Sequence, residues 1–445
     1  MKTMFFYLKI TWSKIVVLTL PLLVIATVGC SGDEQLQRDA IVLNHQANSI
    51  RTIEEAFETA EQAIQMLDGQ AGTRAAQTRT INKEQVRIIG DKRTRSSSSN
   101  SSDTLIYIVN YNDNAGFAII SANRGTTALL GVSDCGNYDD AISENKGLAL
   151  FMDMAKAFVG NNPISSPTPP MIEVETTLIA NKNPLITVAW GQKFPEGLYC
   201  PNTICGCANT AAIQIFSYYE SPIFLNLTFP QRERYYILIN WTEIKKHYSG
   251  GSSYASHTNC LANVNSHKNI GEMARQCAVY AQSVFSYNGI VVPSTDPLPY
   301  SYTNYVAWPN AQTGTGISGI VNMIEAMGFV RPYFSYYTSL CTQTDLNLNR
   351  PIYMVGHCSE GGHAWVVDGY KYYQDVTTHH ATVPETITTS YRYYNHVNWG
   401  WYGVANGYFL DGVFATNSAY SYDNSSLGYP NYSFTMGLSY APIEL

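Results

Sequence analysis

The amino-acid sequence predicts an α+β protein of two parts, a small α+β domain over residues 31–165 and a larger α+β domain over residues 184–445. Helix-like and strand-like patterns occur in both parts, which is typical of this class. Four prolines lie between Pro163 and Pro170. Because a proline cluster makes a stiff and exposed segment, residues 166–183 are expected to form a connector between the domains.

The small domain is expected to begin with an amphipathic helix. Thr52 and Glu55 have the spacing of a capping box, in which each side chain bonds to the other residue's backbone N–H. Apolar residues then recur at three- and four-residue spacing: Ile53, Phe57, Ala60, Ile64 and Leu67. Residues 145–158 show a similar pattern, which predicts a second helix.

A β-hairpin and a loop are also expected in the small domain. Two apolar runs, residues 105–109 and 117–120, flank a turn-rich segment that contains Asn112, Asn114 and Gly116. This arrangement predicts a hairpin. Residues 70–103 are rich in Arg, Lys and Ser, and this composition predicts a flexible loop outside the core.

The overall composition narrows the class of protein. Apolar residues make up 45% of the 445 residues and charged residues only 14%, so the chain can bury a large core. The 33 tyrosines and the few charges favour an extracellular protein. The net charge of −7 argues against a nucleic-acid partner.

The N-terminal residues 1–29 predict a signal peptide of the lipoprotein type. Lys2, Lys9 and Lys14 precede or open an apolar stretch, residues 15–28, that is too short to span a bilayer. The stretch ends at Cys30 in a pattern that resembles a bacterial lipobox, with ordinary signal cleavage nearby as the alternative. We therefore expect export across the inner membrane and a lipid on Cys30. That lipid would be the only link to the membrane, at the outer membrane or the cell surface.

The nine cysteines do not indicate a disulfide-stapled scaffold. Cys200, Cys205 and Cys207 lie close together, but their spacing lacks the paired Cys-x-x-Cys of a structural zinc site. We expect no metal and no cofactor.

Cys207 is the first candidate for catalysis. It precedes an apolar pattern of helical spacing that includes Ala211, Ile215 and Tyr219, so the cysteine is expected in the first turn of a helix. Unpaired backbone N–H groups and the helix dipole favour a thiolate at that position. The alternative is a buried, inert cysteine.

His363 is the candidate base, 156 residues after Cys207. It follows two glycines and opens a strand-like run, residues 364–367, so it could reach across a cleft to take the thiol proton. His357, six residues earlier, is the less favoured alternative.

Three further residues suit supporting roles. Asn398 could accept a hydrogen bond from the imidazole of His363 and fix its tautomer. Trp399 and Trp401 could shield that bond from water. Gln192, fifteen residues before Cys207, could donate its amide to the oxyanion that forms on attack.

Four blocks of sequence resemble, in order, the signature blocks of the streptopain family of bacterial cysteine peptidases. They are Trp190-Gly191-Gln192, Gly206-Cys207-Ala208-Asn209, Gly362-His363-Ala364-Trp365 and His396-Val397-Asn398-Trp399-Gly400-Trp401. Residues 107–122 resemble that family's propeptide. The chain departs from the pattern at Asn209, where alanine is more usual, and at Cys205.

The resemblance implies a papain-like cysteine protease fold held inactive by an N-terminal pro-domain over residues 31–165. It implies Cys207 as nucleophile, His363 as base, Gln192 as oxyanion donor and Asn398 with Trp399 as the pair that orients the imidazole. Gly362 would meet the substrate backbone, and Trp401 is placed with it at the substrate. The family prefers an apolar side chain two residues before the scissile bond and needs no metal.

The sequence therefore predicts a secreted or surface-anchored cysteine endopeptidase made as a zymogen. Its partners would be protein or peptide substrates and its own pro-domain, and activation would cut the connector at residues 166–183. Two alternatives remain: a catalytically idle surface-binding lipoprotein on the same fold, and an enzyme that transfers the acyl group to an amine instead of water.

Overall fold

The computed structural model describes residues 49–68, 79–90, 104–162, 172–227, 235–247, 264–293, 310–358, 361–380, 384–415, 420–422, 432–434 and 438–445. The described residues fall within one compact unit, Ala47–Leu445. The expected signal peptide and Cys30 lie outside the described residues. In the described part of the chain, no helix is both long and apolar enough to cross a membrane.

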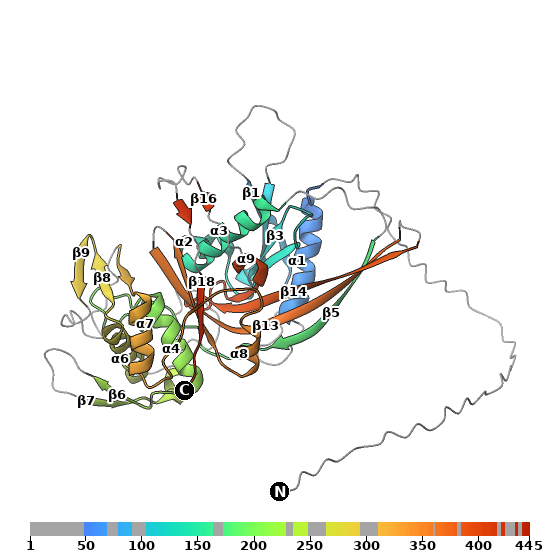
Figure 1. The fold of residues 1–445 in the computed structure, drawn as a ribbon. Coiled ribbons are helices and arrows are strands. Elements are labelled where there is room, and N and C mark those ends of the chain that lie inside the picture. Colours follow the sequence, from blue (N-terminus) through green and yellow to red (C-terminus); the bar gives the residue numbers. More distant parts are fainter. Residues whose placement is uncertain are drawn as a thin grey trace, which may run out of the picture. The chain divides into compact units, whose positions relative to one another are not determined.

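The N-terminal region combines helices with four antiparallel strands (Figure 1). Its elements are α1 (Ile53–Asp68), β1 (Ile81–Gly90), β2 (Thr104–Tyr111), the 3-10 turn η1 (Asn112–Asn114), β3 (Phe117–Ser121), β4 (Leu129–Ser133), α2 (Tyr138–Glu144) and α3 (Lys146–Asn161). The predicted helices at residues 53–67 and 145–158 and the hairpin of β2 and β3 are confirmed. The prediction of a loop over residues 70–103 is wrong in part, because residues 81–90 of that range form β1, which pairs with β2.

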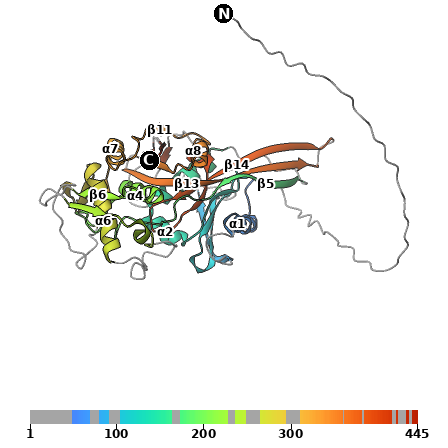
Figure 2. The same cartoon turned by 90° about the horizontal axis from the view of Figure 1, so that it is seen from below.

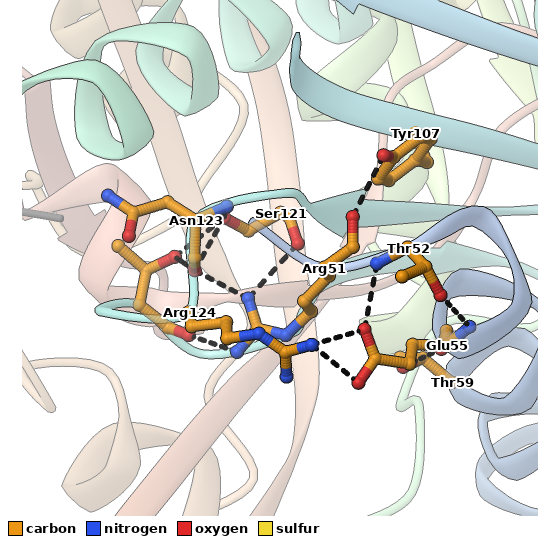
Figure 3. Close-up of polar contacts among 9 residues, drawn as sticks. Arg51, Thr52, Glu55, Thr59, Tyr107, Ser121, Asn123 and Arg124 are labelled. Atoms are coloured by element: carbon orange, nitrogen blue, oxygen red, sulfur yellow. Dashed lines mark hydrogen bonds and ion pairs between the residues drawn. The ribbon is translucent and has the colours of Figure 1, made fainter. Parts of the chain in front are cut away.

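The capping box predicted for α1 forms as expected. The backbone N–H of Thr52 donates to Glu55 Oε2 at 2.7 Å, and the Glu55 N–H donates to Thr52 Oγ1 at 3.3 Å. Figure 3 shows that a wider polar cluster surrounds this helix start. Arg51 donates to the carbonyl oxygens of Ser121, Asn123 and Thr126, while Arg124 forms an ion pair with Glu55. These contacts join α1 to the turn after β3.

The C-terminal region is built on a helical half and a sheet. Its elements are α4 (Cys207–Tyr219), β6 (Phe224–Leu227), β7 (Tyr235–Leu238), α5 (Trp241–Ile244), α6 (Val264–Tyr280), β8 (Val284–Tyr287), β9 (Ile290–Pro293), β10 (Gln312–Gly314), α7 (Ile317–Ala326), β11 (Ser335–Tyr336), α8 (Gln343–Asn347), β12 (Ile352–Cys358), β13 (Gly361–His379), β14 (Thr386–Asn398), β15 (Gly407–Leu410), α9 (Asp411–Phe414), β16 (Tyr420–Tyr422), β17 (Tyr432–Phe434) and β18 (Leu438–Pro442).

One eleven-stranded sheet runs through both regions: ten strands follow the order β1-β2-β3-β4-β15-β14-β13-β12-β18-β11, and the eleventh, β5, pairs with β13 off this path. The junction lies between β4 and β15, where Tyr408 faces Val132. The N-terminal region is therefore docked on the C-terminal region by backbone hydrogen bonds as well as by side chains.

Part of the expected connector is a strand. The segment β5 (Ile172–Lys182) pairs with β13, from Ile172 opposite His379 to Lys182 opposite Tyr370. The strands β5, β13 and β14 run side by side away from α4 (Figures 1 and 2). Alternating Ile172, Val174 and Thr176 explain the strand, since β-branched residues favour extended backbone. Residues 163–171 lie outside the described part of the chain.

Strand β13 separates two buried cores. Trp365 and Val367 belong to the core that the N-terminal region shares, while Ala364 and Val366 belong to the core around α4. Successive side chains of a strand point to opposite faces of its sheet. The continuous apolar run of residues 364–367 is thus explained by burial on both faces, and the position of His363 follows from it.

Candidate active site

Helix α4 begins at Cys207, as the sequence predicts. The N-cap is Gly206, which has φ 89°, a left-handed conformation that favours glycine. A Cβ atom there would lie 2.9 Å from Thr313, so β10 also requires a glycine at this position. The tight approach places the thiol of Cys207 at the positive end of the helix.

The thiol of Cys207 lies against the strand that carries His363. Cys207 is half-buried, and its burial raises the pKa of the thiol above its ordinary value. Backbone hydrogen bonds from Ala364 and Ala208 and the positive charge of Lys146 act in the opposite direction but are smaller. At neutral pH the thiol is therefore protonated in this state of the protein.

His363 lies on β13, one residue before Ala364, with its imidazole on the same side of the strand as Trp365. The two rings are stacked with their centroids 6.1 Å apart. The Nε2 atom lies 3.2 Å from the carbonyl oxygen of Trp399 and donates to it, since a carbonyl can only accept. Burial lowers the pKa of His363 from 6.5 to about 4, although the hydrogen bond to Trp399 raises it, and nearby Lys146 lowers it further. The imidazole is therefore neutral at neutral pH.

Helix α3 of the N-terminal region covers this imidazole. Gly147 lies so close that an added Cβ would be 2.6 Å from His363 Cδ2 and 2.8 Å from His363 Nε2, and would also collide with the ring of Trp399. Asn145 caps α3 by accepting from the Leu148 N–H at 3.0 Å. A helix start of the N-terminal region is thus seated against the candidate base.

Gln192 lies in a coil segment next to the start of α4. Its carbonyl oxygen accepts from the Cys205 N–H at 2.8 Å, and the carbonyl of Gly191 accepts from Thr210 Oγ1 at 2.9 Å. These bonds tie the Trp-Gly-Gln segment to the same turn that positions Cys207. Gln192 therefore lies beside the turn that leads into Cys207, and its role as oxyanion donor stays a prediction.

Asn398 is close to the site, but its hydrogen bonds go elsewhere in this state. Its Nδ2 donates to the carbonyl oxygen of Val188 at 3.1 Å, and its Oδ1 accepts from the Gly400 N–H at 3.1 Å. His363 bonds to the backbone of Trp399 and not to this amide. The sequence prediction that Asn398 orients the imidazole is therefore not met while α3 is in place.

The remaining predicted residues lie on the same segments as Cys207, His363 and Asn398. Trp399 is fully buried and packs edge-on against Phe409 at 5.2 Å. Trp401 is half-buried with the Lys193 ammonium 6.0 Å from its ring centroid, and Gly362 is exposed. Cys205 is buried, and its thiol contacts Thr210 Oγ1 at 3.2 Å. Among the described residues, no group of three or more His, Cys, Asp or Glu side chains could hold a metal ion.

A buried His–Asp pair supports the site and was missed by the sequence reasoning. His396 Nδ1 lies 2.6 Å from Asp368 Oδ1, and the other carboxylate oxygen of Asp368 accepts from the Ile186 N–H at 2.9 Å. Burial lowers the pKa of His396, but the Asp368 carboxylate outweighs it and raises the pKa above 6.5. His396 opens the fourth block and Asp368 follows the third by three residues, but no local pattern indicates their contact, because it joins two strands 28 residues apart.

A thiol at the start of a helix, a histidine on the adjoining strand and an N-terminal region seated over both define a papain-like cysteine peptidase together with its inhibitory pro-region. The family comparisons agree. A model described as "Peptidase C10 family" matches residues 188–409, and one described as "Spi protease inhibitor" matches residues 47–159. The chain belongs to the peptidase C10 family of streptopain-like cysteine peptidases and carries a propeptide of the Spi type.

Known proteins of this kind are similar over most of the chain. Streptopain of Streptococcus pyogenes is 24% identical over 336 residues, which cover 68% of this chain and 73% of streptopain. Streptopain of serotype M1 gives the same values. A solved fragment of Prevotella intermedia prointerpain A is 19% identical with a TM-score of 0.49, and the match covers 80% of this chain and 98% of the fragment.

Proposed function

We propose that this chain is the zymogen of a secreted, lipid-anchored cysteine endopeptidase in which Cys207 is the nucleophile and His363 the base. The observation that carries the proposal is the placement of Gly147 from the pro-region against His363, whose neighbour Ala364 donates its backbone N–H to the Cys207 thiol. An inhibitory segment at this point makes sense if His363 and Cys207 react together. A binding protein has no need to cover that pair.

The geometry supports a latent state. A papain-like site works as a thiolate and imidazolium pair, so it needs a low thiol pKa and a high imidazole pKa. Here burial shifts both in the opposite sense, and the positive charge of Lys146 further disfavours a second positive charge on His363. With α3 seated, the site therefore holds a neutral thiol and a neutral imidazole.

Removal of the pro-region would restore the reactive pair. Without Gly147 and Lys146, His363 regains water and space to turn from the Trp399 carbonyl toward Cys207. The imidazole would then take the thiol proton, and the thiolate would attack a peptide carbonyl. His363 would return the proton to the leaving amine, and water would hydrolyse the acyl-enzyme.

The other residues have supporting roles in this proposal. The Gln192 amide and the Cys207 N–H would bind the oxyanion, and loss of such a donor typically costs about 10²–10³-fold in rate. Asn398, covered by Trp399, would hold the imidazole once it has turned. Gly362 and Trp401 would meet the substrate, for which the family resemblance suggests an apolar side chain two residues before the scissile bond.

Activation would cut the chain between the pro-region and the catalytic region, within residues 161–184. Strand β5 is hydrogen-bonded to β13 along its length. A cut before Ile172 would leave β5 in the sheet of the mature enzyme. A cut after Lys182 would leave β5 attached to the pro-region, so the strand would have to separate from β13 when the pro-region leaves. Lipidation of Cys30 would hold the zymogen at the outer membrane or cell surface.

The test is to express residues 31–445 beside the Cys207→Ala variant and to follow chain length and N-terminal sequence. The wild type should shorten by about its pro-region and then react with a thiol-specific epoxide, whereas the variant should remain intact. If an added protease removes the pro-region and the product neither hydrolyses casein nor reacts at Cys207, the proposal is wrong. Radiolabelled palmitate incorporation, compared between full-length wild type and Cys30→Ser, tests the anchor separately.

A further inference from the structure

We propose that Tyr402 is a positioning residue that holds the oxyanion-binding segment Trp190-Gly191-Gln192 in place. This inference rests on the proposed function, because it assigns a role within that reaction. The role is carried by its hydrogen bonds to the backbone on both sides of Gln192.

The segment needs an external support because it has no secondary structure. Residues 186–191 are coil, and Gln192 and Lys193 lie in a bend. On the side of α4, the segment is held by the Gln214 side chain, which accepts from the Trp190 N–H at 3.1 Å, and by Thr210, which donates to the Gly191 carbonyl. The bond from the Cys205 N–H to the Gln192 carbonyl adds a third contact on this side, and none of the three reaches the N–H of Lys193.

Tyr402 supplies the support on the other side. Its hydroxyl oxygen accepts from the Lys193 N–H at 2.7 Å, and the hydroxyl donates toward the Phe194 carbonyl at 3.4 Å. Its own backbone N–H donates to the Trp190 carbonyl at 3.2 Å. Tyr402 therefore bonds to the residue that follows Gln192 and to the residue two before it.

The ring of Tyr402 completes the clamp. It lies flush against the Cα atom of Gly191, where any added Cβ would collide with three atoms of the ring. Only 2% of Tyr402 is exposed. Gly191 and Tyr402 thus fit each other, and the backbone before Gln192 has no room to move toward the ring.

Tyr402 adopts an unusual backbone conformation for this purpose. Its φ is 55°, in the left-handed region that an aromatic residue rarely occupies. Gly400 and Gly403, on either side, also have positive φ. A strained aromatic residue between two glycines indicates that its side chain is needed where it lies, since glycine would adopt the same turn without strain.

The clamp also joins the two ends of the candidate site. Tyr402 lies three residues after Trp399, whose carbonyl holds His363. One short turn thereby contacts the segment of the candidate base and the segment of the candidate oxyanion donor. The expected role is to keep the Gln192 amide aligned with the oxyanion, which matters more in the transition state than in substrate binding.

The experiment compares wild type, Tyr402→Phe and the control Tyr370→Phe, each made with its pro-region and cut by the same added protease. Tyr370 is a matched control because it is also buried and donates its hydroxyl to Asn347 at 2.8 Å, away from the site. Active sites are counted with the epoxide. Tyr402→Phe should lower kcat by about tenfold with KM unchanged, and weaken a peptide aldehyde inhibitor by about the same factor. Its rate of Cys207 alkylation by iodoacetamide should not change, because that reaction forms no oxyanion.

A double-mutant cycle with Gln192→Ala adds a second measurement. If Tyr402 acts through Gln192, its substitution should have little further effect once the amide is gone. Three results for Tyr402→Phe would each overturn the inference: a loss of kcat that adds to that of Gln192→Ala, an equal loss in the rate of Cys207 alkylation, or a kcat equal to that of Tyr370→Phe. In all three cases, hydrolysis by the wild type would leave the proposed function standing. A wild type that fails to hydrolyse peptides would overturn both.

Discussion

Gly147→Ala in the pro-region should weaken latency, and its effect follows from the contacts of one added methyl group. The new Cβ would lie 2.6 Å from His363 Cδ2 and 2.8 Å from His363 Nε2, closer than atoms in a packed interior approach each other. Both neighbours are held, His363 by its bond to Trp399 and Trp399 by full burial. The collision therefore has to be relieved by moving α3 away from the site.

Two opposing effects set the free-energy cost of docking α3 in Gly147→Ala. Overpacking by a methyl group in a filled interior costs about 1–3 kcal/mol. Alanine stabilises a helix relative to glycine by up to about 1 kcal/mol, and less in the first turn where Gly147 lies. The net cost of docking α3 is about 1.4 kcal/mol, which corresponds to about a tenfold larger open fraction.

The assay is the rate at which iodoacetamide labels Cys207 in the uncut zymogen. Labelling should be about tenfold faster in Gly147→Ala than in wild type, because the reagent reaches the thiol through the open state. The control is Gly412→Ala, whose added Cβ would lie an ordinary 3.8 Å from Phe158. Labelling of Gly147→Ala at the wild-type rate, with both chains equally stable, would refute the idea that α3 seals the site.

Three further outcomes are expected. Glu55→Ala should lower the free energy of unfolding by about 1–2 kcal/mol by removing the capping box, whereas Ala at the neighbouring exposed Glu54 should have little effect, as chemical denaturation can show. Burial keeps His363 neutral, so docking of the pro-region should be strongest above pH 6.5 and weaken as pH falls toward about 4. The measurement is the affinity of the cut pro-region for a catalytically inert catalytic region as a function of pH, and the pH dependence should be smaller in His363→Gln. An unchanged pH dependence in that variant would show that other groups cause it. Asp368→Ala should destabilise the protein by about 3–5 kcal/mol. The stabilisation from the His396 charge is fully present below pH 6.5 and is lost as pH rises through its raised pKa, so the stability gap between wild type and His396→Gln should narrow as pH rises above 6.5.

Local patterns predicted the elements whose stabilising contacts are local. The capping box at Thr52 and Glu55 joins residues three apart, so its outcome could be read from the chain itself. The hairpin of β2 and β3 has a short connection, and the helix that starts at Cys207 follows from Gly206 and the apolar residues after it. These features depend little on the rest of the fold.

Elements that depend on distant partners were not predicted. Strand β1 lies in a stretch whose charged composition indicates a loop, and it becomes a strand because Val86 pairs with Val109. Strand β5 exists because β13, nearly two hundred residues later, offers an edge for it. Neither partner can be identified from the composition of the segment, because pairing between strands is a property of the assembled sheet.

The chain alone reveals a thiol at a helix start, a histidine at a strand start and an amide segment ahead of them, in the order of a streptopain-like peptidase. These groups can be recognised from the sequence because each needs a particular local backbone, and the neighbouring residues that form this backbone are adjacent in the chain. The three-dimensional fold adds that His363 bonds to Trp399, that Asn398 bonds to Val188 and that Gly147 lies against the candidate base. The first two contacts join distant segments of the catalytic region. The Gly147 contact forms because the pro-region continues the catalytic sheet at β4 and β15, and sheet pairing of this kind is decided by the assembled fold.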